Sequence, residues 1–281
     1  MAETELKDFP SIFSLKGKVA VVTGGFLQAG ASKVYITSRK AAACDAAVAA
    51  LNKLPNLEPG AKAISVPADS AKFTGVQHLV NEVAKTTDHV DILFANAGAS
   101  WGEAFDTHPD EAFAKIMDLN VKSVFNTIRL FAPLLQKKAT HDDPSSVIIT
   151  GSVAGISIGT LGRQGTYGYS ASKAAAIHLA KNLAVELAPR GIHVNAIAPG
   201  FFPTKLANGL LDLSGGAELT AQKNPSRRLG EPEDVAGTVV FLSSRAAKHI
   251  NGAVVTIDGG EVLATGTMSE LGGAEAPKSN L

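Results

Sequence analysis

The sequence predicts an α/β fold: a single domain in which a doubly wound parallel sheet is covered by helices on both faces. Short apolar runs alternate with longer helical segments along the 281 residues. Such alternation is typical of parallel strands joined by helical crossovers, and right-handed crossovers make the sheet doubly wound. No Pro- or Ser-rich linker divides the chain. We therefore predict an N-terminal extension over 1–15, one domain over 16–260 and a tail over 261–281.

Seven runs are expected to be strands because they are apolar through most of their length, as strands buried on both faces are. In chain order they are 18–23, 33–37, 63–66, 91–95, 147–150, 193–198 and 253–257. The segments expected to be helices are 41–54, 73–87, 109–137, 170–189 and 232–243. Pro109 and Pro232 suit the first turn of a helix, where a missing N–H costs no hydrogen bond. Gly215 and Gly216 lie in a polar stretch that we expect to be a loop.

Composition excludes several classes of partner. Lys and Arg total 26, as do Asp and Glu, so a basic nucleic-acid surface is not expected. No apolar run reaches 18 residues, so no membrane span is expected. The single cysteine, Cys44, permits no internal disulfide, and no metal site is predicted. The first residues lack a secretory pattern, which favours the cytoplasm, although the final Ser279, Asn280 and Leu281 resemble a peroxisomal tripeptide.

Tyr169 and Lys173 are the sharpest candidates for chemistry. They stand four residues apart, so on a helix they point the same way. A phenol with a pKa near 10 is a poor acid–base group at neutral pH, and a nearby cation favours its ionised form. A surface Tyr–Lys pair is the alternative interpretation. Tyr167 is a weaker candidate because Ala171, not a lysine, lies four residues beyond it.

Three polar residues strengthen this interpretation. Ser152 follows a predicted strand directly, where folds of this class bind ligands, although it could be an ordinary turn serine. Asn96 ends the preceding strand. Asn120 interrupts an apolar helix. Its side chain could belong to a functional site, or it could simply form a hydrogen bond with a backbone group.

This ordered set resembles the short-chain dehydrogenase/reductases over roughly residues 16 to 260. The residues that carry the resemblance are Asn96, Ala97, Gly98, Asn120, Ser152, Tyr169, Lys173, Pro199, Gly200, Asp258, Gly259 and Gly260. Within the family the chain is most similar to 3-oxoacyl-acyl carrier protein reductases of the rhamnolipid type. The resemblance implies a Rossmann fold, a small carbonyl substrate and a homotetramer or homodimer packed through the helices at 109–137 and 170–189.

The resemblance also implies roles for individual residues. Tyr169 would donate a proton to the carbonyl oxygen, Ser152 would bind that oxygen, Lys173 would bind the nicotinamide ribose and lower the pKa of Tyr169, and Asn120 would hold a proton-relaying water. The residues implied to bind NADP(H) are Gly24, Ser38, Arg39, Asp69, Asn96, Gly98, Tyr169, Lys173, Pro199, Gly200, Phe202 and Thr204. The second predicted strand is followed by Arg39 and no acid, which favours the 2′-phosphate of NADPH. Arg39 and Lys40 could instead be a solvated helix start.

One part of the family pattern is incomplete. The family reads T-G-x-x-x-G-x-G after the first strand, whereas Gln28 stands here in place of the middle glycine. Only seven residues, 26–32, separate Gly25 from the second strand, and a crossover with its helix needs at least about 10–12. The first crossover helix is therefore predicted to be truncated. We expect poor NADPH binding, and an exposed apolar face near Val19, Val21 and Val34.

Three functions remain open at this stage. The leading hypothesis is an NADPH-dependent carbonyl reductase acting on a 3-oxoacyl compound or related ketone. The alternatives are a catalytically silent protein that keeps the fold for binding or assembly, and an NADP-dependent alcohol dehydrogenase. The loop at 201–225, with Phe201, Phe202, Leu206, Leu210 and Leu211, is expected to cover an apolar substrate or to form a subunit contact.

Overall fold

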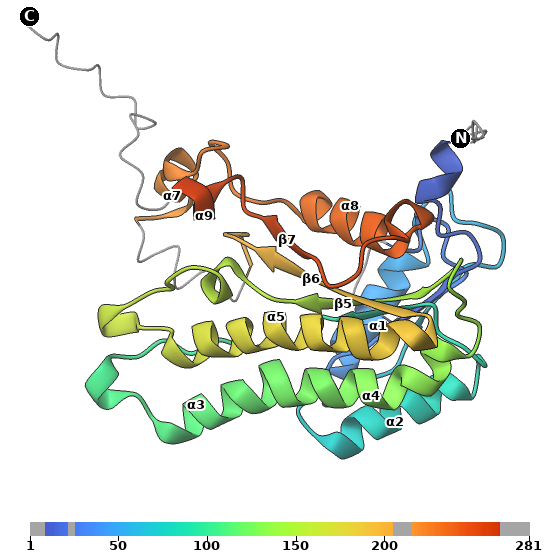
Figure 1. Ribbon diagram of the computed structural model, residues 1–281, viewed down its shortest axis with the longest axis horizontal. Coiled ribbons are helices and arrows are strands. Elements are labelled where there is room, and N and C mark those ends of the chain that lie inside the picture. Colours follow the sequence, from blue (N-terminus) through green and yellow to red (C-terminus); the bar gives the residue numbers. More distant parts are fainter. Residues whose placement is uncertain (1–8, 22–25, 205–214, 265–281) are drawn as a thin grey trace, which may run out of the picture.

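The computed structural model describes residues 9–21, 26–204 and 215–264. Its centre is one seven-stranded sheet with the order β3-β2-β1-β4-β5-β6-β7 (Figure 1). All neighbouring strands run parallel. The direction of winding reverses between β1 and β4, which is the switch point of a doubly wound fold. The predicted fold class is confirmed.

Each predicted strand is present, with ends that differ by a few residues. The strands are β1 Val19–Val21, β2 Lys33–Ile36, β3 Lys62–Ser65, β4 Ile92–Ala95, β5 Ser145–Thr150, β6 Ile192–Pro199 and β7 Val254–Ile257. The inner strands are buried on both faces, as their continuous apolar character predicts.

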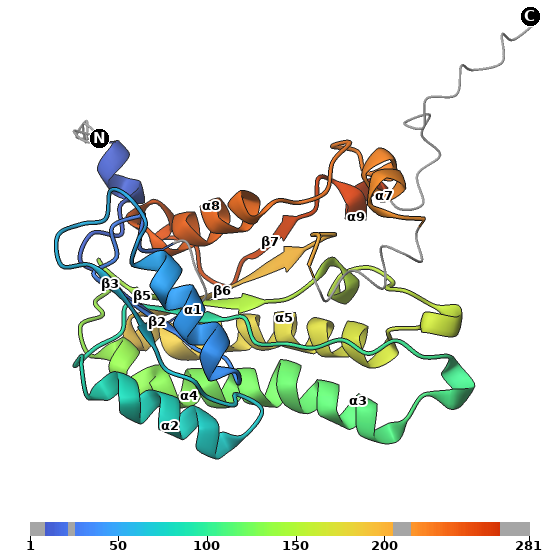
Figure 2. The ribbon, with the colours of Figure 1, turned by 180° about the vertical axis from the view of Figure 1, so that it is seen from behind.

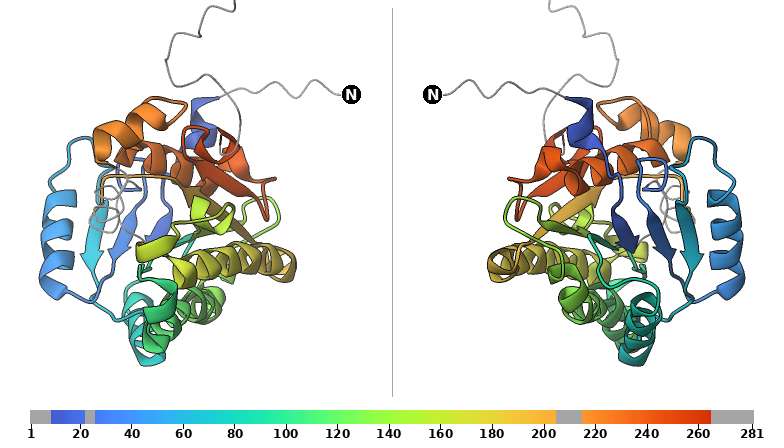
Figure 3. Two further views of the ribbon diagram at one scale, coloured as in Figure 1. Left: turned by 90° about the vertical axis from the view of Figure 1, so that its left-hand side faces the viewer. Right: turned by 90° about the vertical axis from the view of Figure 1, so that its right-hand side faces the viewer.

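The helices cover the two faces of the sheet unequally (Figures 2 and 3). They are α1 Ala41–Leu51, α2 Phe73–Ala84, α3 Asp110–Met117, α4 Ser123–Gln136, α5 Tyr167–Leu187, α7 Ala217–Lys223, α8 Pro232–Ser243 and α9 Glu261–Ala264. Side chains of α2, α4 and α5 form one core cluster with the sheet. Those of α1 and α8 form a second cluster on the other face.

Three helical features differ from the sequence prediction. The helix expected over 109–137 is divided by a π-helical turn, Asp118–Lys122, between α3 and α4. The polar stretch after Gly216 forms α7. The short α9 lies in the predicted tail. Neither α7 nor α9 has the long apolar periodicity that identifies a helix in sequence.

The described part of the connection between β1 and β2 has no helix. Residues 26–32 form turns, closed by backbone hydrogen bonds from Ala31 to Phe26 (3.1 Å) and from Gly30 to Leu27 (3.2 Å). Phe26 and Leu27 are 0% and 1% exposed. They belong to the same core cluster as α1 and α8, so apolar side chains from a turn fill space on the face where a crossover helix would pack.

The expectation of an exposed apolar face is therefore wrong. Val19, Val21 and Val34 are only 3%, 2% and 1% exposed. Val19 and Val21 lie on the face covered by α2 and α4, whereas Phe26 and Leu27 belong to the cluster on the other face. Val34 lies on the face that Phe26 and Leu27 occupy.

Segments next to the predicted domain limits take part in the packing. The 3₁₀ turn Pro10–Phe13 brings Phe13 against Phe241 of α8, with 6.4 Å between the ring centroids. Leu15 is fully buried and bonds the first connection through its backbone N–H to the Ala29 carbonyl at 2.9 Å. The limits at residues 16 and 260 stay a prediction.

Among the described residues no helix is both long and apolar enough to cross a membrane. The same part of the chain holds no cluster of three His, Cys, Asp or Glu side chains suited to a metal ion. The C-terminal tripeptide lies outside the described residues, and nothing found below supports a peroxisomal location.

The packing of the first connection generates a stability prediction. Phe26→Ala should lower the free energy of unfolding by about 3–5 kcal/mol, because it removes a fully buried ring from a core cluster. Urea unfolding followed by circular dichroism measures this change. Leu263→Ala, at a side chain 83% exposed, is the control and should cost less than about 0.5 kcal/mol. Equal effects from the two variants would contradict the packing role of Phe26.

Candidate active site

A cavity of about 600 Å³ opens at the carboxyl ends of β4, β5 and β6. Ligands of doubly wound folds bind at this edge of the sheet. Nine of the residues singled out from the sequence line it: Asn96, Gly98, Ser152, Tyr169, Lys173, Pro199, Gly200, Phe202 and Thr204. The cavity therefore brings together residues that are more than one hundred positions apart in the chain.

Ser152 and Tyr169 meet through their hydroxyls. Ser152 follows β5 and starts the 3₁₀ turn Val153–Gly155, where its hydroxyl accepts the Ala154 N–H at 3.2 Å. Burial raises the pKa of Tyr169, and the hydrogen bond with Ser152 opposes that rise. The phenol is thus protonated at neutral pH, with a hydroxyl partner beside it.

Lys173 lies one turn beyond Tyr169 on α5 and is only 4% exposed. Its Nζ donates to the Thr150 carbonyl at 2.7 Å and lies 5.6 Å from the centroid of the Tyr169 ring. Burial lowers the pKa of Lys173 to about 8. The ammonium therefore still carries its charge at neutral pH, although the site disfavours it.

Asn120 lies in the π-helical turn between α3 and α4, and π turns often occur at functional sites. Its side chain satisfies both backbone groups of Ala99 at 2.9 Å each and donates to the Ser172 hydroxyl at 2.9 Å. It thus anchors the segment after β4 to α5. Asn120 does not line the cavity, so its part in a proton relay stays a prediction.

Three glycines allow the elements of the site to approach closely. A Cβ on Gly98 would lie 3.2 Å from the Asn120 Oδ1 and 3.4 Å from the Lys173 Nζ. A Cβ on Gly155 would lie 2.6 Å from the Ala174 nitrogen. A Cβ on Gly151 would lie 2.9 Å from the Ile197 carbonyl oxygen. Side chains at these positions would push the loops after β4 and β5 away from α5 and β6.

Tyr167 has a different environment from Tyr169. Its ring packs edge-on against Phe105 and His108, with centroids 5.9 and 6.2 Å away, and it does not line the cavity. Of these two tyrosines, Tyr169 lines the cavity with Lys173 and Tyr167 does not, as their spacing from Lys173 predicts.

The residues predicted to bind the adenosine half of the cofactor lie at the same edge of the sheet, beyond the cavity. Ser38 and Arg39 follow β2 and are exposed. The loop that carries Asp69 follows β3 and is tied to them by a bond from the Ala68 N–H to the Ser38 carbonyl at 3.0 Å. The Thr37 hydroxyl beside them is buried without a hydrogen-bond partner among the described residues. Gly24 lies outside the described residues.

Sequence reasoning missed several residues of the site. Ser172 is fully buried, and its position between Tyr169 and Lys173 was the available indication. The Thr150 carbonyl that holds Lys173 has no residue-type signature, because any residue supplies a carbonyl. Glu261 and Val262 of α9 line the cavity, and burial followed by repulsion from Asp258 raises the pKa of Glu261. Phe201 also lines it, whereas Leu206, Leu210 and Leu211 lie outside the described residues.

Comparisons with known proteins agree with this geometry. Residues 21–261 match the family model described as Enoyl-(Acyl carrier protein) reductase. The chain is 37% identical to the Rhamnolipids biosynthesis 3-oxoacyl-[acyl-carrier-protein] reductase of Pseudomonas aeruginosa, over 88% of this chain and 97% of that protein. It is 35% identical to the 3alpha-hydroxysteroid dehydrogenase of Mediterraneibacter gnavus, over 87% of this chain and 97% of that protein.

A solved structure, the active-site complex of Pseudomonas aeruginosa RhlG with NADP, matches with a TM-score of 0.81 and 36% identity. The match covers 90% of this chain and 99% of that one. The fold is thus common to this chain and a protein solved with NADP.

The burial of Lys173 generates a prediction about stability. A pKa lowered from 10.5 to about 8 means that the site disfavours the charge by roughly 3 kcal/mol. Lys173→Met should raise the free energy of unfolding at pH 7 by about 1–2 kcal/mol, after loss of the bond to Thr150 is subtracted.

The gain should shrink as the pH rises from 8 towards 10.5. Over that range the unfolded lysine binds more protons than the folded one, so the unsubstituted protein becomes relatively more stable. Denaturant unfolding at pH 7 and pH 10 measures both values. Lys181→Met, at an exposed position of the same helix, is the control and should change little at either pH.

Proposed function

The chain belongs to the short-chain dehydrogenase/reductase family of oxidoreductases, and from this premise we propose that it is an NADPH-dependent carbonyl reductase. It would convert a 3-oxoacyl compound or a related ketone to a secondary alcohol. The observation that carries the proposal is the convergence of Ser152, Tyr169 and a charged, buried Lys173 on one cavity.

The proton chemistry of these residues suits reduction. A carbonyl that receives a hydride becomes an alkoxide, which needs a proton and a nearby positive charge. Tyr169 keeps its proton at neutral pH because burial raises its pKa, so it can donate to that oxygen. Ser152 would hold the same oxygen, and Lys173 would supply the positive charge. When bound, the reduced nicotinamide supplies the hydride.

The described residues fit the cofactor at its two ends. Gly98, Pro199, Gly200, Phe202 and Thr204 line the cavity beside Tyr169, where the nicotinamide and its ribose would lie. At the other end, Ser38 and Asp69 flank the adenosine position, and Arg39 is exposed where it could meet a 2′-phosphate. This arrangement favours NADPH over NADH and agrees with the NADP bound in RhlG.

The described residues do not fit the pyrophosphate, which forms the middle of the cofactor. Dinucleotide sites hold the pyrophosphate at a helix N-terminus, whose free N–H groups and positive dipole end face the phosphates. Residues 26–32 form turns and supply no such helix. This observation favours the second candidate function, a silent member of the family that keeps its fold for binding or assembly.

The substrate is proposed to be apolar around its carbonyl. Val153, Ile158, Phe201, Phe202 and Val262 line the cavity. The relatives include a reductase of 3-oxoacyl chains and a hydroxysteroid dehydrogenase, and both substrate classes are largely hydrocarbon. The same residues would serve alcohol oxidation with NADP, which is the reverse reaction.

A homotetramer or homodimer is proposed to form through α3, α4 and α5. These helices carry apolar side chains that the single chain leaves exposed: Phe113 is 39% exposed, Phe125 42% and Val185 77%. Exposed apolar side chains of this kind are available for a subunit contact. A cytoplasmic location stays a prediction.

The incomplete connection predicts weak cofactor binding. Calorimetric titration should give no micromolar affinity for NADPH, because the pyrophosphate lacks its helix N-terminus. Insertion between Gly25 and Phe26 of about a dozen residues, of the form S-R-G-I-G followed by a short alanine-rich helix, should restore micromolar binding. Micromolar binding by the unmodified chain would show that it holds the pyrophosphate in another way.

Tyr169→Phe, made in the chain with the inserted loop, tests the proton donor. Turnover of a 3-oxoacyl thioester, followed by NADPH absorbance, should fall at least about a hundredfold, because the general acid is lost. Tyr167→Phe is the matched control, since that ring packs outside the cavity, and it should keep near-normal turnover. Near-normal turnover in both variants would remove Tyr169 from the mechanism. No turnover in the restored chain itself would favour the silent candidate.

A further inference from the structure

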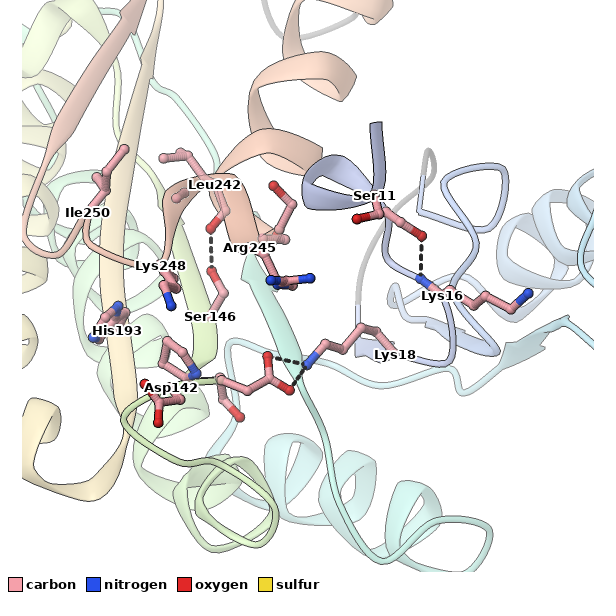
Figure 4. Close-up of a pocket in the computed structure, with 17 residues that line it drawn as sticks. Ser11, Lys16, Lys18, Asp142, Ser146, His193, Leu242, Arg245, Lys248 and Ile250 are labelled. Atoms are coloured by element: carbon pink, nitrogen blue, oxygen red, sulfur yellow. Dashed lines mark hydrogen bonds and ion pairs between the residues drawn. The ribbon is translucent and has the colours of Figure 1, made fainter. Parts of the chain in front are cut away.

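A second cavity, of about 540 Å³, lies at the opposite edge of the sheet (Figure 4). It is bounded by the segment before β1, the loop before β5, the start of β6 and the turn after α8. The side chains that matter for its charge are Lys16, Lys18, Asp142, Asp143, His193, Arg245 and Lys248. Its volume falls within the range of small-molecule sites, and it shares no residue with the candidate active site.

The charges around this cavity do not balance. The Lys18 Nζ binds both carboxylate oxygens of Asp143, at 2.9 and 2.8 Å, and also lies 3.6 Å from Asp91. Lys18 and Asp143 therefore neutralise each other. Arg245 and Lys248 have no acidic partner among the described residues, and both are exposed. Only Asp142 opposes them within the lining of the cavity.

Capping of α8 does not account for these two cations. Basic residues after a helix commonly bind its last carbonyls and interact with its dipole. Here other donors occupy those carbonyls: the Ser146 hydroxyl binds the Leu242 oxygen at 3.0 Å, and the Ser244 hydroxyl binds the Phe241 oxygen at 2.8 Å. Neither Arg245 nor Lys248 makes a side-chain hydrogen bond to any described residue, so both keep their donors available.

A buried hydroxyl also indicates a ligand in this cavity. Ser243, 8% exposed, lines the cavity, and its buried hydroxyl has no partner among the described residues. A buried hydroxyl without a partner costs free energy that a ligand oxygen could recover.

We infer that this cavity binds a small phosphate-bearing metabolite through Arg245 and Lys248. The two residues stand three positions apart in one short segment, the 3₁₀ turn Arg245–Ala247 and the residue after it. A guanidinium can bind two phosphate oxygens in its planar fork, and a lysine adds a point charge. The ligand lies at the amino ends of β5 and β6, whereas the carbonyl chemistry lies at their carboxyl ends.

Titration calorimetry with inorganic pyrophosphate at low ionic strength tests the inference on the full chain. Arg245→Ala/Lys248→Ala should weaken pyrophosphate binding at least about tenfold, because two charge-assisted contacts are lost. Lys53→Ala/Lys115→Ala removes the same charge from exposed sites elsewhere and should leave affinity within about twofold.

A third variant separates this site from the cofactor site. Arg39→Ala should leave pyrophosphate affinity within about twofold if the phosphate binds at Arg245 and Lys248. Loss of binding in Arg39→Ala alone would assign the pyrophosphate to the cofactor site and overturn the inference. Absence of measurable binding, or equal weakening in the Arg245/Lys248 and Lys53/Lys115 variants, would also overturn it. None of these outcomes depends on carbonyl reductase activity.

Discussion

The burial of the Lys173 ammonium against the Thr150 carbonyl is the constraint on which the candidate active site depends. A charged group 4% exposed needs a close hydrogen-bond acceptor, and the end of β5 supplies it at 2.7 Å. This bond requires α5 to lie close to the loops after β4 and β5. Gly98 and Gly155 permit that approach because they have no side chain. Asn120 then fixes the loop after β4 to α5 from the other side.

In the first connection, residues 26–32 fill the hydrophobic core but supply no helix N-terminus. Phe26 and Leu27 satisfy the hydrophobic requirement of one face of the sheet, so the fold does not need a helix there to keep β1 and β2 in the core. The dipole and the free amides of a helix N-terminus cannot be replaced by apolar side chains. A chain of this kind can retain a well-packed sheet although residues 26–32 of its first connection form no helix.

The two cavities lie at opposite ends of β5 and β6, and different kinds of side chain line them. At the carboxyl edge, the buried Lys173 ammonium and the hydroxyls of Ser152 and Tyr169 line one cavity, which is the arrangement on which the proposed carbonyl chemistry rests. At the amino edge, Arg245 and Lys248 are exposed and have no acidic partner among the described residues, which suits an anion. β5 and β6 connect these edges, and each edge is accessible independently of the other.

The sequence by itself determined the order of the strands and of the long helical segments, the doubly wound class and the candidates Ser152, Tyr169 and Lys173. Those features follow from local periodicity and from fixed spacings such as the four positions from Tyr169 to Lys173. It also indicated, by length alone, that the first connection lacks a full crossover helix. The burial of Val19, Val21 and Val34 could not be predicted in this way, because it depends on the face of the sheet on which each side chain lies.

Only the tertiary structure decided the remaining features. Phe26 and Val34 belong to one core cluster, the Thr150 carbonyl holds Lys173, and α9 lines the cavity. Arg245 and Lys248 have no acidic partner among the described residues. Each of these depends on contacts between segments distant in the chain. Backbone carbonyls and buried faces have no residue-type signature, so a pattern along the chain cannot identify them; only the packing of the sheet against its helices brings them together.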